Sequence, residues 1–199
     1  MRSIAFAILA LSLSQPAQAF ELINPLSVIS NAVEAAVEDR SSSDIAADTK
    51  LKVDIVATIS DKMGTDVASV STDVYEQDVM LTGVVETGKQ KTQAGKIAQN
   101  AKGAKKVHNE ILVIPKTAEG KGAVEGFVDD TVIEKKINAL LLDAKGVNVT
   151  NFRWRSVGGH AFLFGRSLSK AELKKAIAVV KDIKGVSKVT ARVKVRAKK

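Results

Sequence analysis

The chain has 199 residues, of which 45% are hydrophobic and 26% charged, proportions typical of a soluble globular protein with one or two domains. Its 30 Lys and Arg residues outnumber 22 Asp and Glu residues, and the resulting net charge of +8 favours anionic partners. The absence of cysteine excludes disulfides, thiol nucleophiles, thiolate metal sites and lipid attachment through cysteine.

The N-terminal segment 1–19 has the pattern of a secretory signal peptide. Arg2 precedes an apolar run at 4–14, and the sequence AQA at 17–19 provides an A-x-A cleavage site. A retained membrane anchor is disfavoured, because the run is too short to span a bilayer. We therefore expect a periplasmic mature protein that begins near Phe20 and is not a lipoprotein.

Two segments are expected to flank or connect the domains. The segment 20–45 has a proline near its start and apolar residues at helical spacing, which predicts a short amphipathic helix that packs on a domain. The segment 115–128 is rich in glycine and small residues and is predicted to be an interdomain linker.

The sequence repeats itself at one constant offset, which aligns position 81 with position 163. The aligned pairs include LTG (81–83) with LFG (163–165), and KKVHNEILV (105–113) with SKVTARVKV (187–195). The offset holds throughout without a gap, so we expect a tandem duplication with domains at 46–114 and 129–199.

Each copy begins with a predicted amphipathic helix. In the first copy Asp48 is expected to be the N-cap. The apolar positions recur every four residues, as on one face of a helix, and are Leu51, Ile55 and Ile59 in the first copy and Ile133, Ile137 and Leu141 in the second. Alternating apolar and polar residues then predict two strands separated by a turn, with the turns at 76–78 and 157–160.

Capping boxes mark the second helix of each copy, at Thr87-x-x-Gln90 and Ser169-x-x-Glu172. Gly103 and Gly185 follow these helices and are expected to be left-handed C′ residues. A final strand completes the order helix-strand-strand-helix-strand, twice. The predicted fold class is therefore α+β, with the helices packed on one face of a small mixed sheet.

A glycine interrupts the predicted second strand at the same place in each copy, Gly83 in DVMLTGVVE and Gly165 in HAFLFGR. Glycine weakens a strand interior, so it needs a structural reason. We expect a strand end or bulge where the backbone bends toward the next helix, or a helix that packs too closely for a Cβ.

These features together resemble the BON domain family. The matching stretches are LTGVV and IAQNAKGAKKVHNEILV in the first copy, and LFGRS and VVKDIKGVSKVTARVKV in the second. The resemblance covers 46–114 and 129–197. A signal peptide followed by two such domains is similar to the dual-BON envelope proteins of Gram-negative bacteria. It implies a non-enzymatic role in phospholipid binding, envelope integrity and osmotic stress tolerance, with no cofactor.

The two copies differ in charge. Residues 129–199 carry 17 basic and 6 acidic side chains, a net of +11, whereas 20–128 carry 12 and 16, a net of −4. A basic exported domain suits anionic lipid head groups. The alternative is a protein-interaction or scaffold module of the envelope, in which the two copies meet different protein partners.

The candidate lipid-binding residues lie on the first helix of the second copy. Lys135 and Lys136 are expected at the head groups, while Val132 or Leu142 enters the apolar layer. The resemblance supports this helix, because lipid contact in dual-BON proteins is attributed to the second domain. The alternative, in which apolar residues here form core and the lysines face solvent, stays open.

Alternation predicts which way the strands of the second copy face. Phe152 and Trp154 should point to the core, and Arg153 and Arg155 should lie on the other side of the strand. In the C-terminal RVKVRAKK, the basic residues share one face and are Arg192, Lys194 and Arg196. This face is either a solvated sheet surface or an extension of an anionic-ligand surface.

No catalytic constellation is evident. His160 follows a glycine pair at a predicted turn and His108 lies on a predicted strand, and without cysteine or a neighbouring histidine neither suggests a metal site. We therefore expect neither an enzyme nor a metal protein. Export also argues against nucleic acid as a partner.

Overall fold

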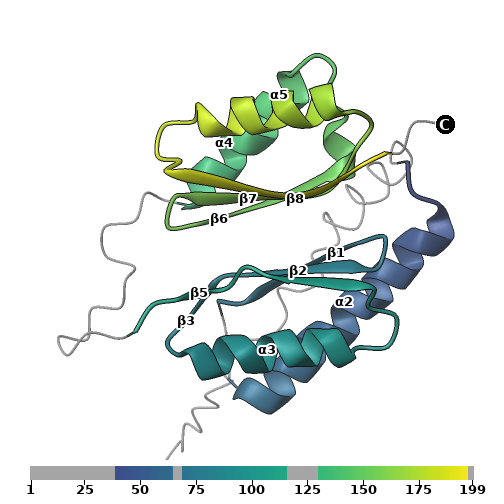
Figure 1. The fold of residues 1–199 in the computed structure, drawn as a ribbon, viewed down its shortest axis with the longest axis vertical. Coiled ribbons are helices and arrows are strands. Elements are labelled where there is room, and N and C mark those ends of the chain that lie inside the picture. The colour runs from purple at the N-terminus through teal and green to yellow at the C-terminus, as the bar shows by residue number, and fades with distance from the viewer. Residues whose placement is uncertain (1–38, 65–68, 116–129, 197–199) are drawn as a thin grey trace, which may run out of the picture.

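The computed structural model describes residues 39–64, 69–115 and 130–196. The expected signal peptide, the predicted helix of the N-terminal segment and nearly all of the linker lie outside these ranges. Two α+β domains follow one another along the chain, and in each a pair of helices covers one face of a three-stranded sheet (Figure 1). This is the predicted fold class.

The described elements of the first domain are α2 (Ser42–Met63), β1 (Ser71–Tyr75), β2 (Asp78–Thr82), β3 (Val84–Val85), α3 (Gly88–Asn100), β4 (Lys106–Asn109) and β5 (Leu112–Val113). Those of the second domain are α4 (Asp130–Asp143), the 3-10 helix η2 (Val149–Asn151), β6 (Phe152–Val157), β7 (His160–Ser167), α5 (Lys170–Lys181) and β8 (Lys188–Val195).

Both sheets have the same mixed topology. The central strand pairs antiparallel with the strand before it and parallel with the strand that follows the second helix, which gives the orders β1-β2-β4 and β6-β7-β8. In the first domain a short parallel pair, β3 with β5, continues the sheet. The parallel pairing requires a crossover, and α3 and α5 supply it.

The helices bury the stripes that their spacing predicts. Ile55 and Ile137 are fully buried between the helices and the sheet of their own domains. Phe152 and Trp154 both pack into the second core, as the strand alternation predicts. Each domain therefore has its own hydrophobic core, which is aliphatic in the first domain and includes Phe152 and Trp154 in the second.

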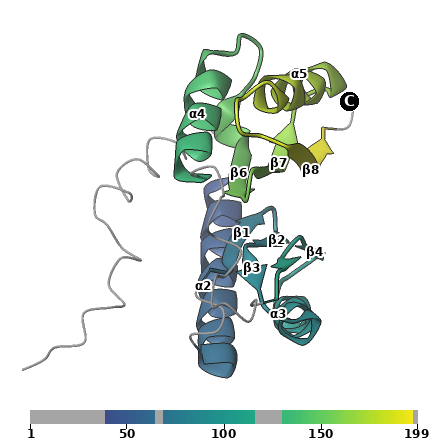
Figure 2. The ribbon, with the colours of Figure 1, turned by 90° about the vertical axis from the view of Figure 1, so that its left-hand side faces the viewer.

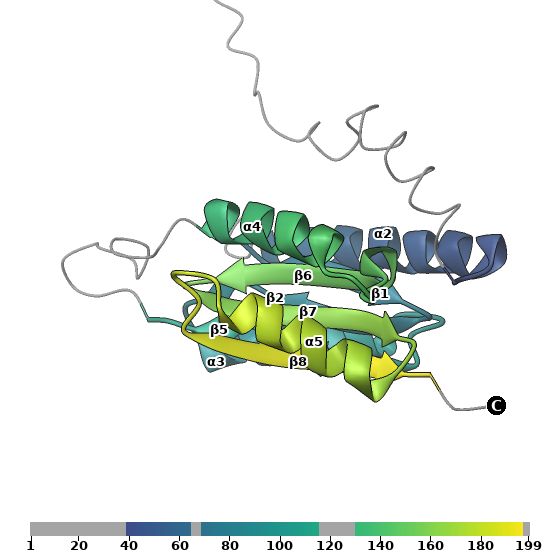
Figure 3. The same ribbon diagram turned by 90° about the horizontal axis from the view of Figure 1, so that it is seen from above.

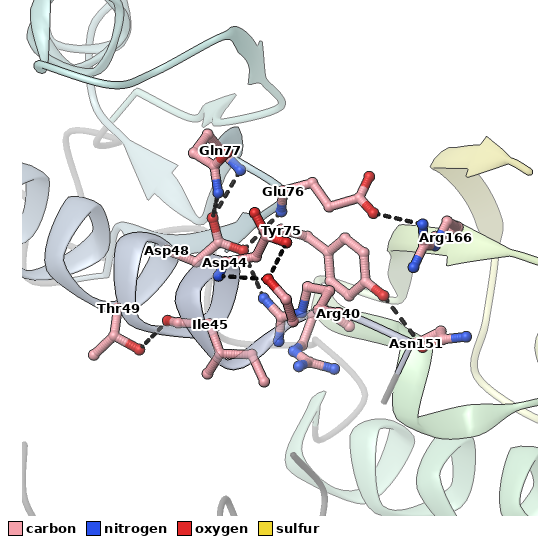
Figure 4. Close-up of polar contacts among 12 residues, drawn as sticks. Arg40, Asp44, Ile45, Asp48, Thr49, Tyr75, Glu76, Gln77, Asn151 and Arg166 are labelled. Atoms are coloured by element: carbon pink, nitrogen blue, oxygen red, sulfur yellow. Dashed lines mark hydrogen bonds and ion pairs between the residues drawn. The ribbon is translucent and has the colours of Figure 1, made fainter. Parts of the chain in front are cut away.

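The first helix begins earlier than predicted, and Asp48 is not its N-cap. Ser41 is the N-cap, and its hydroxyl accepts a hydrogen bond from the amide of Asp44 at 3.1 Å. Asp48 lies inside α2 and is buried, with its carboxylate directed at the turn between β1 and β2 (Figure 4). The earlier polar run SSSD offered a better cap, which freed the carboxylate for a tertiary role.

That role is to hold a hairpin turn. The carboxylate of Asp48 accepts hydrogen bonds at 2.7 Å from the amides of Glu76 and Gln77, which have φ values of 53° and 63° (Figure 4). The equivalent Asp130 accepts from the amides of Gly158 and Gly159 in the second domain. Two-residue hairpin turns with positive φ at both positions favour glycine, as in the second domain. The first domain has glutamate and glutamine at these positions, and an equivalent aspartate binds both amides.

Gly83 and Gly165 sit where a Cβ has no room. Their φ values are 116° and 110°, and a Cβ would lie 2.1 Å from the carbonyl oxygen of Ser69 and 2.2 Å from that of Asn151. The close neighbour is thus the backbone leading into the preceding strand, and not the following helix. In the first domain Gly83 also separates β2 from β3, whereas β7 runs through Gly165.

Gly103 and Gly185 lie beyond the helices but not at C′. The helices end at Asn100 and Lys181, and each glycine occupies the third position of a β-turn, closed by hydrogen bonds from Ala104 to Ala101 and from Val186 to Ile183. Both have φ near 100°, as the third position of a type II turn requires.

The two sheets face each other, and the helices lie on the outer sides. Figure 1 shows α4 and α5 above the upper sheet and α2 and α3 below the lower one, and Figure 2 shows the same layers from the side. Seen from above, the strands of the second domain overlie those of the first (Figure 3). The two helical layers therefore lie on opposite sides of the paired sheets.

Candidate functional site

The helix α4 lies in the outer layer of the second domain. Three residues spaced four apart, Ile133, Ile137 and Leu141, are fully buried on its inner side. In a helix this spacing defines one narrow stripe, so the residues between them face outward. The predicted lipid-binding residues all fall on this outer side.

The outer side combines apolar and cationic groups. Val132 is 41% exposed and Leu142 is 70% exposed, and Lys135 and Lys136 are both exposed between them. Neither this leucine nor this valine is part of the core, which removes the core interpretation for these two residues. Apolar and cationic side chains therefore share the outer side of α4.

The structure extends this surface to α5, which packs beside α4. Lys170, Lys174 and Lys181 are exposed on it. These lysines were not predicted as part of the surface, because in the sequence the segment of α5 stands out only by its capping box and apolar stripe. Their signal was present as the lysines in KAELKKAIAVVK, which carries one acidic residue, the buried Glu172.

Between the two sheets lies a small aromatic cluster. Tyr75 and Met80 from the first domain are buried against Phe162 and Phe164 from the second. The hydroxyl of Tyr75 donates a hydrogen bond to the side-chain oxygen of Asn151 at 3.2 Å (Figure 4). This cluster is separate from the two domain cores and joins the sheets.

Ion pairs surround the cluster, and each joins an acidic group of the first domain to a basic group of the second. The pairs are Asp73 with Arg155 (3.0 Å), Glu76 with Arg166 (2.7 Å), Asp78 with Lys194 (2.9 Å) and Glu110 with Arg192 (2.6 Å). The carboxylate of Asp73 raises the pKa of the Arg155 guanidinium, against the opposing effect of its burial. Acidic side chains of the first copy and basic side chains of the second therefore neutralise each other across the interface.

Equivalent positions of the repeat meet in this interface. Asp73 and Arg155 occupy the same position in the two copies, as do Glu110 and Arg192, and as do Met80 and Phe162 in the apolar cluster. Contacts between equivalent positions are characteristic of a two-fold interface. The two domains thus pair in the manner of a symmetric dimer whose polar contacts have become unlike.

The interface also shows what the basic face of the C-terminal strand β8 contacts. Arg192 and Lys194 face the acidic residues of the first domain, and Arg196 lies 3.7 Å from Asp39. This face is therefore neither simply solvated nor an extension of an outward anionic-ligand surface, the two interpretations that strand alternation left open. Strand alternation identified the face but not what lies opposite.

Comparison with known proteins identifies the repeated unit. The model of the BON domain family matches residues 47–115 and 129–197. The chain belongs to the BON domain family. It carries two BON domains in tandem, and the constant offset of the repeat is the spacing between them.

Two relatives are similar in sequence. The chain is 29% identical over 132 residues to an uncharacterized protein in the gshII 5' region of Anaplasma centrale, covering 66% of this chain and 85% of the relative. It is 31% identical over 121 residues to osmotically-inducible protein Y of Escherichia coli K12, covering 61% of this chain and 58% of that protein.

Among solved structures, the C-terminal domain of CdsD, a structural protein of the type III secretion system of Chlamydia trachomatis, is similar. The identity is 13%, the coverage is 75% of this chain and 67% of that one, and the TM-score is 0.31. A likeness of this size carries no statement about function.

The two histidines lie at the interface edge of the BON domains. His160 is the first residue of β7 and not part of the turn, stacks on Phe162 at 4.0 Å and shares a 2.8 Å hydrogen bond with Thr190. His108 lies on β4, as predicted, with its ring 6.2 Å from that of Phe164. Burial lowers the pKa of both imidazoles, with nearby cations contributing further.

Within the described residues, no group of three histidine, cysteine, aspartate or glutamate side chains is placed to hold a metal ion. No helix in that part of the chain is both long and apolar enough to cross a membrane. The exposed apolar and cationic side chains of α4, with the exposed lysines of α5, make the outer surface of these two helices the candidate functional site.

Proposed function

We propose that the protein is exported to the periplasm, where it binds anionic phospholipid surfaces without catalysing a reaction and supports the envelope under osmotic stress. The observation that carries the proposal is the outer side of α4, where Val132 and Leu142 are exposed beside Lys135 and Lys136. The name of the Escherichia coli relative, osmotically-inducible protein Y, supports the link to osmotic stress.

The chemistry of the surface favours a membrane over a small anion. Each lysine near an anionic membrane contributes about 1 kcal/mol, and the leucine adds apolar burial that a dissolved anion does not offer. The scaffold alternative has no comparable support. The acidic groups of the first sheet that a basic partner would need, Asp73 and Glu110 among them, already pair with the second domain.

Vesicle flotation tests the electrostatic part. Lys135→Glu with Lys136→Glu should lower affinity for phosphatidylglycerol vesicles by more than about 30-fold at low salt, since two favourable charges become unfavourable. The matched control is Lys105→Glu with Lys106→Glu, another exposed lysine pair with the same charge change. Equal losses in both double variants, or no binding of the wild-type chain at low salt, would contradict the proposal.

A second variant tests the apolar part. Leu142→Asn should weaken vesicle binding by about fivefold at every salt concentration, because apolar burial is not screened by salt. Val53→Asn on α2 is the control, since Val53 is 59% exposed on the opposite helical layer. A Leu142→Asn protein that binds like wild type would restrict the contact to electrostatics.

A further inference from the structure

A groove lies between α2 and α3 on the outer side of the first domain. It has a volume of about 710 Å³, and Gln93 bridges it by donating a hydrogen bond to the carbonyl oxygen of Lys62 at 3.4 Å. Its polar lining includes four lysines, which are Lys62, Lys89, Lys96 and Lys102. A hollow with this lining suits a ligand with several negatively charged oxygens.

Among the described residues, none of the four groove lysines forms an ion pair with a carboxylate. The described lining holds one acidic residue, Asp54, and its carboxylate is already paired with Lys50 at 2.8 Å. The charge of the groove is therefore available to an external anion.

This positive groove lies in a domain whose charges cancel, because residues 46–114 carry 9 basic and 9 acidic side chains. Four acidic side chains of that domain are paired across the interdomain interface, on the opposite side of the sheet from the helices. The helix α3, in contrast, has three lysines and no acidic residue. The zero net charge of residues 46–114 thus conceals a cationic helix, α3, on the outer side of the domain.

We propose that the α2–α3 groove binds the phosphate head groups of anionic phospholipids and forms a second membrane-contact site. Threonine and amide side chains, Thr92 and Gln93, lie among the lysines and can donate to phosphate oxygens. The helices α2 and α3, which line the groove, lie below the lower sheet, whereas α4 and α5 lie above the upper one (Figure 1). One molecule can therefore hold two anionic membrane surfaces together, a step that rests on the proposed α4 contact, whereas groove binding itself does not.

Vesicle clustering by the full chain tests the proposal. Wild-type protein should cluster vesicles of equimolar phosphatidylcholine and phosphatidylglycerol, measured by light scattering. Lys89→Glu with Lys96→Glu should still float with vesicles through α4 but lower clustering by at least about tenfold, because two of the cationic contacts to the second surface are reversed. Both positions are exposed on α3, and glutamate suits a helix, Lys89 in particular lying in the first turn.

The matched comparison uses single changes on the same helix. Lys96→Glu should reduce clustering more than Lys91→Glu, because Lys91 does not line the groove. Equal clustering by wild type and the Lys89→Glu, Lys96→Glu variant would overturn the proposal. Binding of wild-type protein without any clustering would overturn the bridging step.

Amide chemical shifts separate the groove from α4 and lipid from free phosphate. In the Lys135→Glu, Lys136→Glu chain, phosphatidylglycerol bicelles should still shift the amides of Thr92 and Gln93. Absence of these shifts would overturn groove binding even if the α4 proposal holds. Inorganic pyrophosphate that shifts the same amides, with no response to bicelles, would overturn the lipid assignment in favour of a free phosphate ligand.

Discussion

The two BON domains share a fold and differ in charge. Acidic side chains of the first and basic side chains of the second lie on the facing sides of the two sheets. The acidic groups of the first domain and the basic groups of the second meet across the interface, at positions that include Asp73 opposite its repeat equivalent Arg155. Two copies of the first domain paired in the same way would place aspartate against aspartate. The divergence therefore favours unlike pairing and disfavours like pairing.

The outer layers of the domains resemble each other more than the net charges suggest. Both expose lysines on paired helices, α4 with α5 and α2 with α3. What distinguishes the second domain is the number of exposed apolar side chains on its first helix, Val132, Leu140 and Leu142, against Val53 on α2. A net charge thus says less about a partner than the side of the sheet on which the charges lie.

The largest effect is expected where the domains agree most closely. Gly83→Val and Gly165→Val should each lower the free energy of unfolding by about 3 kcal/mol or more, because each adds strained φ and a clash with a carbonyl oxygen. Thermal or urea unfolding measures the loss. A variant as stable as the parent would show that the backbone at Ser69 or Asn151 moves away easily.

Loss of the carboxylate that holds the hairpin turn should destabilise the first domain more than the second. Asp48→Ala should cost about 3 kcal/mol, because it removes the acceptor of the Glu76 and Gln77 amides and also the buried ion pair of Asp48 with Arg40 at 2.6 Å. Asp130→Ala should cost about 2 kcal/mol, because the groups that donate to its carboxylate are uncharged. Equal losses in urea unfolding would mean that the ion pair with Arg40 contributes little.

The interface charges are tested by a swap. Arg155→Glu should destabilise the chain by about 2 kcal/mol, because Asp73 is only 3% exposed, would face a second carboxylate and would keep only the longer contact with Lys52 at 3.8 Å. Adding Asp73→Arg should recover part of this loss, and a double-mutant cycle gives the coupling. Additive effects of the two changes would show that the pair contributes no coupling energy.

The same cycle at Glu110 and Arg192 should give a coupling below about 1 kcal/mol, because the Arg192 side chain is 45% exposed. This coupling should fall further when salt is raised, whereas the more buried pair at Asp73 should change less. A larger coupling at Glu110 than at Asp73 would contradict this order.

The smallest effect concerns pH. Burial lowers the pKa of His108 and His160 below the ordinary 6.5, so the folded chain favours the neutral imidazoles. Stability should be constant above pH 6.5 and fall as the pH drops from 6.5 through the lowered values. The chain with both His→Gln changes should lose this dependence in urea unfolding between pH 7.5 and 5, about the range in which histidine titrates. If the double variant keeps the same pH dependence of stability, groups other than these two histidines cause it.

Local patterns predicted what depends on neighbours in the chain. The capping box at Thr87 and Gln90 forms as expected, and the glycines Gly83 and Gly165 were correctly singled out as needing a structural reason. The apolar stripes of α2 and α4 are buried as predicted. Such features follow from helix and strand periodicity, which sequence spacing displays directly.

The candidate site was only partly accessible from the sequence. Periodicity placed Val132 and Lys135 on the outer side of α4, but only the packed helix pair added Lys174 and Lys181 of α5. The groove between α2 and α3 was not predicted, because its lysines come from two helices separated by three strands. Two segments so distant in sequence show no shared pattern before they fold together.

The duplication, the order of elements and the family can all be derived from the chain alone, because they follow from a constant offset and local periodicity. The packing of the domains was needed to show that Asp48 holds a turn instead of capping a helix, and that Arg192 faces Glu110 instead of solvent. A carboxylate or guanidinium has several partners available to it in the chain. Which one it meets depends on how the two domains pack, and that is a property of the whole fold.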